Sequence, residues 1–78
     1  MFLEIITPDK KIFEGEVSVA QFPGTTGSFE ILNDHAPIIS TLAKGKIKVV
    51  DIEKKTQTFE IKSGVVEVLK NKIIVLAE

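Results

Sequence analysis

The sequence predicts an all-β protein, an antiparallel β-sandwich or barrel that forms one domain over residues 1–78. Ile, Val and Thr supply 25 of the 78 residues, and these stiff β-branched side chains suit a pleated, half-buried surface. Short apolar runs recur at intervals of about 8–12 residues between turn signals, as in sandwiches and barrels. No stretch of a dozen residues has the 3.6-residue apolar period of a helix, so we expect essentially no α-helix.

Turn-forming residues divide the chain into the expected strands. Clusters of Gly, Pro, Asn and Asp mark turns because each has backbone preferences that a regular strand lacks. In chain order the signals are Pro8–Asp9, Gly15, Pro23–Gly27, Asn33–Asp34, Gly45, Glu53–Gln57, Ser63–Gly64 and Asn71. The segment His35–Leu42 is expected to be extended, because Pro37 disfavours a helical conformation at Ala36.

The order of apolar and polar residues within the runs predicts which strand faces are buried. Lys46–Val49, Phe59–Lys62 and Val66–Val68 alternate with period two. Such alternation indicates one wet face and one buried face, as in antiparallel sheets. Ile73–Leu76 is apolar throughout, so we expect this strand to be covered on both sides.

Composition excludes several classes of function. The chain has no cysteine and one histidine, which excludes a disulfide scaffold, a thiolate metal site and a histidine-rich metal centre. All ten basic residues are lysines and the net charge is −1, which argues against a nucleic-acid partner. No apolar run approaches the roughly 20 residues that cross a membrane, and the N-terminus does not resemble a secretory signal. We therefore expect a cytoplasmic location without direct membrane insertion.

Candidate catalytic groups are few. His35 lies next to Asp34 and is followed by Ser40 and Thr41, but no strand–elbow–helix motif places a nucleophile beside it. A loop histidine that makes a structural hydrogen bond, or that lies at an interface, is the preferred interpretation. Gly24–Gly27 lacks the glycine spacing and the lysine of a phosphate-binding loop. The residues therefore predict a non-enzymatic β module without cofactor or metal.

Two observations indicate a protein partner. Ile31–Leu32 and Ala36–Ile39 place more apolar surface beside a turn than so small a domain buries easily. They form either an exposed contact patch or a cap over an open end of the sandwich. Residues 1–39 hold six acids and two lysines, whereas residues 40–78 hold five acids and eight lysines. These charges either decorate solvated strand faces or polarise the surface toward a partner.

The segment Gly27–Ile39, followed by Lys44–Gly45, resembles the His-Ala-Pro region of the epsilon subunit of F-type ATP synthase, the counterpart of the mitochondrial delta subunit. His35-Ala36-Pro37 is the most specific part of the likeness. The resemblance continues in order over essentially the whole chain. It covers the first hairpin of the family and its last strands, which correspond here to Leu3–Pro8, Phe13–Val17, Ser63–Val68 and Val75–Glu78.

The resemblance implies a flattened β-sandwich of about ten short strands, like the N-terminal domain of that subunit. It also implies a non-catalytic rotor subunit of the central stalk, bound to the gamma subunit and resting on the c-ring. Such a subunit couples proton flow to ATP synthesis without binding a cofactor. It is associated peripherally, through the complex, with the cytoplasmic face of the bacterial plasma membrane.

The resemblance also implies two sets of contact residues. The expected c-ring contacts are Gly27, Ser28, Phe29 and Glu30. The expected gamma contacts are Thr7, His35, Ala36, Pro37, Ile38 and Ser40. Glu30 stands where the family often has glycine, and Ser28 where an acid is common. Because strand positions two apart point to the same face, we expect this exchange to be nearly neutral.

No residues of the sequence match the C-terminal helical hairpin with which the family usually continues. We therefore expect a short form with the β domain only. It is either naturally short, which the start at Met1 favours, or shortened. An unrelated small β-barrel that binds a ligand or peptide is the alternative function that the strand pattern leaves open.

Overall fold

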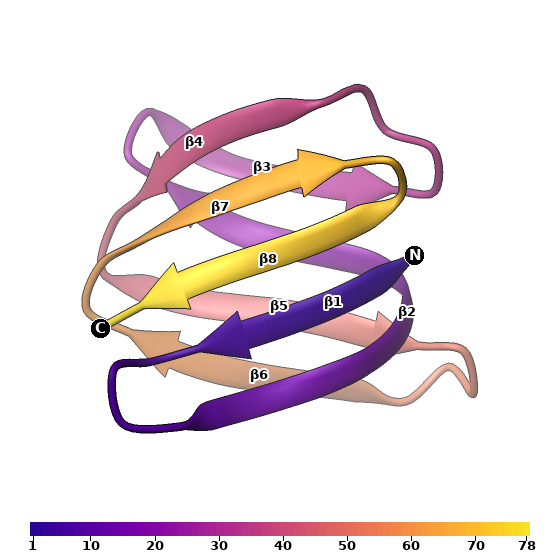
Figure 1. Cartoon of the computed structure of the whole chain (residues 1–78), viewed down its shortest axis with the longest axis horizontal. Coiled ribbons are helices and arrows are strands. Elements are labelled where there is room, and N and C mark those ends of the chain that lie inside the picture. Colours follow the sequence, from indigo (N-terminus) through magenta and orange to yellow (C-terminus); the bar gives the residue numbers. More distant parts are fainter.

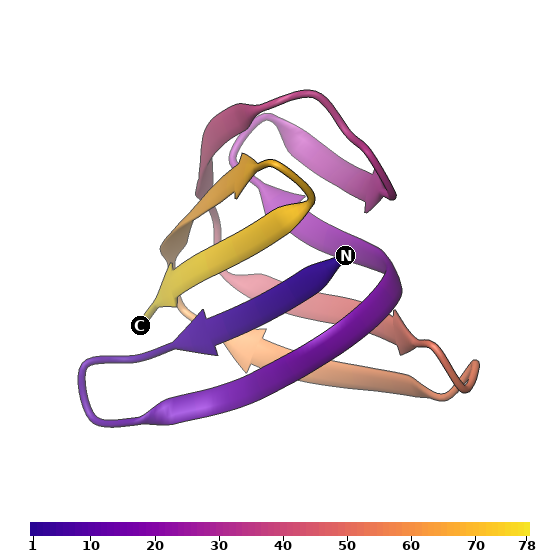
Figure 2. The same ribbon diagram turned by 45° about the vertical axis from the view of Figure 1, so that its right-hand side comes forward.

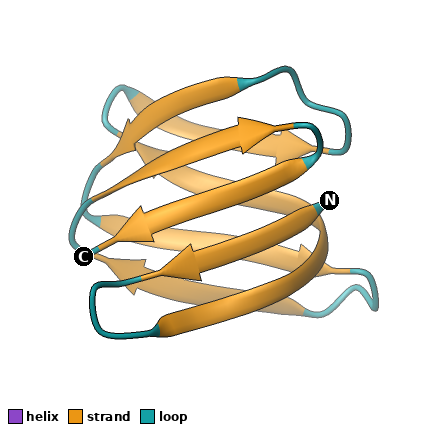
Figure 3. Ribbon diagram, viewed as in Figure 1, coloured by secondary structure: helices purple, strands orange, loops and turns teal.

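A computed structural model describes residues 1–78 and consists of eight β-strands without a helix (Figures 1 and 3). The all-β fold class is confirmed, and no helix is present that could span a membrane. The structure has eight strands where the resemblance implied about ten, and β2 runs unbroken through Gly15, where a turn was expected. The strands are β1 (Phe2–Ile6), β2 (Lys11–Gly24), β3 (Gly27–Leu32), β4 (Ile38–Leu42), β5 (Gly45–Asp51), β6 (Thr56–Ile61), β7 (Gly64–Leu69) and β8 (Lys72–Ala77).

The strands form two layers that the long β2 connects. One layer contains β4, β7, β8 and β1, and the other contains β3, β5 and β6 (Figure 2). The first half of β2 pairs with β1, and its second half pairs with β3 and β5. The change of partner coincides with an irregularity between Val17 and Val19, where Ser18 Oγ donates a hydrogen bond of 3.2 Å to Val50 O. A bulge of this kind increases the bend and twist of a strand, and here the strand curves from one layer to the other.

All strand pairs are antiparallel except β1 and β8, which run parallel. The alternating pattern of single strands predicted antiparallel sheets and did not reveal this pair. Its two strands come from opposite ends of the chain, so no turn between them sets their relative direction. Their pairing is therefore a property of the tertiary fold.

The core lies between the two layers. It contains 16 buried residues, all of them hydrophobic, and no buried polar side chain. The alternation predicted for Lys46–Val49, Phe59–Lys62 and Val66–Val68 is confirmed, because their apolar members face the core and their charged members face solvent. The prediction for Ile73–Leu76 is wrong within this chain. Ile73 and Val75 are buried, but the Leu76 side chain is 58% exposed because no element covers the outer side of β8.

The two ends of the sandwich carry different connections (Figure 1). The first end, which we call the hairpin end, holds the β1–β2, β2–β3, β4–β5 and β6–β7 turns together with Glu78. The opposite end, which we call the loop end, holds Met1, the β3–β4 loop, the β5–β6 turn and the β7–β8 turn. Residues that are distant in sequence are thereby gathered at one end or the other.

The β2–β3 hairpin turns within two residues, Thr25 and Thr26. Gly27 has φ of +133°, a conformation that L side chains rarely adopt. Gly24 is confined by its surroundings, because an added Cβ would lie 2.5 Å from Gly27 O and 2.8 Å from the Phe29 ring. The hairpin tip therefore requires both glycines, each for a different reason.

An ion cluster ties β1 to both of its neighbours. Lys11 Nζ lies 3.0 Å from Glu4 and 3.0 Å from Glu14, and Lys72 Nζ lies 3.7 Å from Glu4. The hydrogen bond from Lys11 is the main cause that holds the pKa of Glu4 below its usual value. The hydrogen bond to Glu4 likewise contributes most to raising the pKa of Lys11. The charge of Glu4 is thus satisfied within the chain.

The close packing at Gly24 predicts that Gly24→Ala lowers the free energy of unfolding by about 1–3 kcal/mol, the usual cost of overpacking. Gly15→Ala is the matched control within the same strand. There an added Cβ meets only the Phe13 ring at 3.6 Å, an ordinary contact. Urea unfolding followed by circular dichroism measures both. Equal stability of the two variants would contradict the packing argument.

The Lys11 contact predicts a low pKa for Glu4 in a carbon-detected NMR titration, and a pKa closer to the usual value in Lys11→Met. Because the folded pKa lies below the unfolded one, the contact stabilises the protein above the unfolded pKa of about 4.3. That stabilisation is lost as the pH falls through the folded pKa. The Tm difference between wild type and Lys11→Met should therefore shrink below about pH 4. In Lys46→Met, which alters a lysine outside this cluster, the pKa of Glu4 should stay low.

Candidate functional site

The four residues expected to contact the c-ring begin β3 at the hairpin end. Ser28 and Glu30 point outward and are exposed, as the spacing of two predicted. Phe29 points inward and packs against Phe22, with ring centroids 5.6 Å apart. The outward surface of this set is therefore polar.

Hydrogen bonds to neighbouring strands hold the hairpin tip in place. Thr25 N donates to Thr41 O at 3.3 Å, and the hydroxyl groups of these two threonines lie 2.9 Å apart. Ala43 N donates to Pro23 O at 2.7 Å. The tip thus rests on the end of β4, in addition to its ladder with β3. It presents a preformed surface rather than a free loop.

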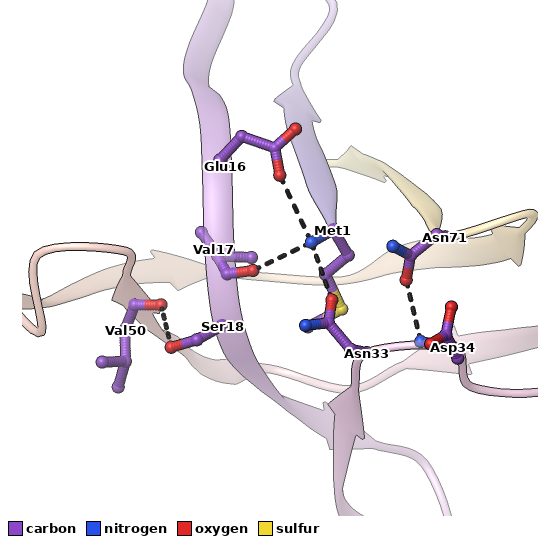
Figure 4. Close-up of polar contacts among 8 residues, drawn as sticks. All are labelled: Met1, Glu16, Val17, Ser18, Asn33, Asp34, Val50 and Asn71. Carbon is purple, nitrogen blue, oxygen red and sulfur yellow. Dashed lines mark hydrogen bonds and ion pairs between the residues drawn. The ribbon is translucent and has the colours of Figure 1, made fainter.

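The loop Asn33–Pro37, which carries three of the expected gamma contacts, lies at the loop end and is anchored from two sides (Figure 4). The Met1 amine donates to Asn33 Oδ1 at 2.9 Å and to Val17 O at 3.2 Å. Asp34 N donates to Asn71 Oδ1 at 2.8 Å. Asp34 has φ of 59°, a left-handed conformation that Asp adopts more readily than most residues. These contacts set the position of the following His35.

His35 makes a local hydrogen bond of the kind expected for a loop histidine. Its Nδ1 donates to Ala36 O over 2.7 Å, and the side chain is half-buried. The Ser40 hydroxyl is 3.4 Å from Thr41 O and does not bond to His35. No group of three His, Cys, Asp or Glu residues is placed to hold a metal ion.

The expected gamma contacts are not brought together at one point. Thr7 follows β1 at the hairpin end, whereas His35 to Pro37 lie at the loop end. Ile38 and Ser40 lie between them on β4, half-buried and on its inward side. These residues therefore mark opposite ends of one sheet layer rather than a compact patch.

The outward sides of the two layers differ sharply in chemistry. Over β3, β2, β5 and β6 the outer side is mostly polar and includes Ser28, Glu30, Lys46, Lys48, Thr58 and Glu60, although Leu32, Val19 and Val50 form a small aliphatic group on it. Over β4, β7 and β8 it is rich in aliphatic side chains. Ile39 is 73% exposed, and Val65, Leu69 and Leu76 are also exposed, with Ile74 half-buried. We call Ile39, Val65, Leu69, Ile74 and Leu76 the apolar face.

The apolar face spans the distance between the two ends of the expected gamma set. At the loop end, Pro37 lines a hollow of about 380 Å³ together with Ile39 and Leu69. At the hairpin end, Thr7 lines a hollow of about 710 Å³ together with Val65 and Leu76. A contiguous apolar surface of this kind marks a protein contact site more often than an ordinary surface.

One carboxylate lies within the apolar face. Glu67 is exposed at the middle of β7, and its cross-strand neighbours are Ile39 on β4 and Ile74 on β8. Its carboxylate takes part in none of the ion pairs and side-chain hydrogen bonds of the structure. Glu4, which follows Ile74 in the same row across β1, is paired with both Lys11 and Lys72. Glu4 thus has cationic partners within the chain, whereas Glu67 has none.

Sequence reasoning located the ends of the apolar face but missed most of its members. The unbroken apolar run Ile73–Leu76 was the available signal, and it predicted a strand covered on both sides. Ile39 belonged to the apolar segment expected to form either a contact patch or a cap. The structure divides that segment: Ile39 is exposed on the apolar face, Leu32 is exposed on β3 in the other layer, and Ile31 is buried in the core. Val65 and Leu69 join Ile39 only through strand pairing.

Curated relatives of this chain are epsilon chains. The "ATP synthase epsilon chain" of Chlorobium limicola is 41% identical over 76 residues, which cover 97% of this chain and 86% of the relative. That of Caulobacter vibrioides is 36% identical and covers 100% of this chain and 90% of the relative. That of Sulfurimonas denitrificans is 43% identical and is matched over 58% of its length.

Two solved structures contain chains of the same fold. One is the mitochondrial ATP synthase of Euglena gracilis, in a structure of its OSCP, F1 and c-ring, with a TM-score of 0.90 and 21% identity over 96% of this chain and 48% of that chain. The other is the central stalk and c-ring of the Tetrahymena thermophila mitochondrial ATP synthase. Its TM-score is 0.80 and its identity 21%, over 99% of this chain and 62% of that chain.

The family model "ATP synthase, Delta/Epsilon chain, beta-sandwich domain" matches residues 1–78. This match agrees with the identity to the epsilon chains and with the observed two-layer fold. The resemblance first noted at His35-Ala36-Pro37 is thereby confirmed, and an unrelated small barrel is excluded. The chain belongs to the ATP synthase delta/epsilon family and has the β-sandwich domain of that family.

Proposed function

We propose that this chain is a non-catalytic rotor subunit of the central stalk of F-type ATP synthase, which links the gamma subunit to the c-ring. The family match and the relatives named ATP synthase epsilon chain support this role. Similar chains also occur in a structure described as central stalk and c-ring. The single observation that carries the proposal is the uncovered apolar face, because it gives this subunit a surface for a protein partner.

The gamma subunit would dock on the apolar face. This face lies between Thr7 at one end and His35 to Pro37 at the other, so one elongated partner could contact both ends at once. Ile38 and Ser40 would act mainly by placing β4, since their side chains point inward. Burial of exposed aliphatic side chains is the main source of affinity in such a contact.

The c-ring would meet the polar hairpin at Gly27, Ser28, Phe29 and Glu30. Ser28 and Glu30 offer hydrogen-bonding groups, and Phe29 anchors the strand to the core through Phe22. The contacts between the hairpin tip and β4 would keep this surface rigid against the rest of the domain. A rigid wedge transmits force between two partners better than a mobile loop.

In this role the chain would turn with the rotor and couple proton flow to ATP synthesis without binding nucleotide or cofactor. It would be a peripheral subunit at the cytoplasmic face of the bacterial plasma membrane, held there by the complex. The core supports such a mechanical function because its 16 buried side chains are all hydrophobic and form one cluster across both layers.

The docking proposal predicts that Ile39→Asp and Leu76→Asp each weaken the complex with the gamma subunit of the same organism by at least about tenfold, since a charge would enter an apolar contact. Isothermal titration calorimetry measures the Kd. Ile52→Asp is the control, because Ile52 is 71% exposed in the β5–β6 turn, away from the face. The proposal fails if wild type forms no complex at micromolar concentration, or if Ile52→Asp is equally disruptive.

The hairpin proposal predicts a different defect for the double variant Ser28→Lys/Glu30→Lys. Its complex with the gamma subunit should form normally, because both positions lie on the other layer from the apolar face. Retention of the rotor subunits on membranes that contain the c-ring should fall, and this is measured by sedimentation and immunoblotting. Normal retention together with normal coupled ATP synthesis would overturn the assignment of the hairpin.

A further inference from the structure

Glu67 lies at a point that a docked partner must cover. Glu67 lies between two shallow hollows of the apolar face, and both Glu67 and Leu69 line each of them. The larger hollow, about 380 Å³, is also lined by Pro37 and Ile39. The smaller hollow, about 120 Å³, is also lined by Lys72 and Ile74. A partner that fills both hollows therefore removes water from the carboxylate between them.

Within the chain this carboxylate forms no ion pair, although a lysine lines the smaller hollow beside it. Lys72, the nearby cation on β8, lies 3.7 Å from Glu4 and has its Nζ 5.8 Å from the centre of the Phe2 ring, so it is directed toward β1. The residues paired with Glu67 across the sheet are both isoleucines. All other ion pairs of the structure involve Glu4, Glu14 or Glu16. No group of this chain is therefore committed to neutralising Glu67 on docking.

We propose that the partner of the apolar face brings a lysine or arginine side chain that pairs with Glu67, flanked by aliphatic side chains that fill the two hollows. Removing a carboxylate from water is costly unless it gains a cation and hydrogen bonds. An apolar partner without such a cation would leave Glu67 buried and unpaired. The inference rests on the proposed docking of the gamma subunit and specifies the chemistry of that contact.

This arrangement makes Glu67 a specificity residue rather than the main source of affinity. The aliphatic side chains around it would bind many apolar surfaces, including a second copy of this chain. A second copy would place acid against acid if the same faces met about a two-fold axis through Glu67. Charge complementarity at one central position selects the partner and its register.

The test uses the intact chain and the gamma subunit of the same organism, with Kd measured at low and high salt. Glu67→Gln should weaken binding about tenfold or more and reduce the dependence of Kd on salt, and Glu67→Lys should weaken it further. Glu60→Gln and Glu60→Lys are the matched controls, because Glu60 is exposed on the outer side of β6 in the opposite layer. Their Kd should match wild type.

Thermal unfolding of the free chain should be nearly the same for all these variants, since the Glu67 carboxylate is exposed and forms no ion pair. Lysine-to-glutamate and arginine-to-glutamate variants of the gamma subunit should include one that restores binding to Glu67→Lys. The inference is overturned if Glu67→Gln binds as tightly as wild type, or more tightly, while Ile39→Asp still disrupts the complex. If wild type fails to bind the gamma subunit at all, the docking proposal itself has failed.

Discussion

The curved path of β2 is the constraint on which the rest of the structure depends. This strand pairs with β1 in one layer and with β3 and β5 in the other. The two layers therefore have β2 in common and enclose one core. The two sheets enclose a core of 16 hydrophobic residues, and no element of the structure covers either outer side. The hydrophobic side chains that point away from the core are consequently left at the surface.

Because both outer sides are uncovered, their difference in chemistry carries functional meaning. Lysines, threonines and acids occupy most of one side, where solvent can hydrate them, beside a small aliphatic group that includes Leu32. Aliphatic side chains occupy the outer side of the other layer, where Ile39 is 73% exposed. Exposure of such side chains does not stabilise a free monomer. Two acids on the same side also differ, since Glu4 is paired within the chain and Glu67, on the other side of Ile74, is not. The fold thus presents a polar hairpin and a wide apolar face, and these are the surfaces on which the two proposed contacts depend.

Much of the fold could be predicted because it depends on local signals. Alternation in Lys46–Val49 and Phe59–Lys62 identified their buried sides, and Asn71 lies in the predicted β7–β8 turn with φ of 62°. The turn predicted at Gly15 was wrong, because the local preference of glycine carries no information about the pairing of this position with β1. The candidate site was predictable only in part. Its ends followed from the likeness around His35, whereas Val65 and Leu69 are adjacent to Ile39 only through strand pairing.

The sequence by itself determined that the protein is an all-β module, that it has no thiol and no histidine cluster, and that it belongs with epsilon chains. Those conclusions follow from composition, from period-two alternation and from the His-Ala-Pro segment, all of which are local in the chain. Only the tertiary structure decided that β1 and β8 pair in parallel and that Glu67 stands alone among aliphatic side chains. The reason is physical: these relations join residues far apart in sequence, and no local preference specifies which strands become neighbours.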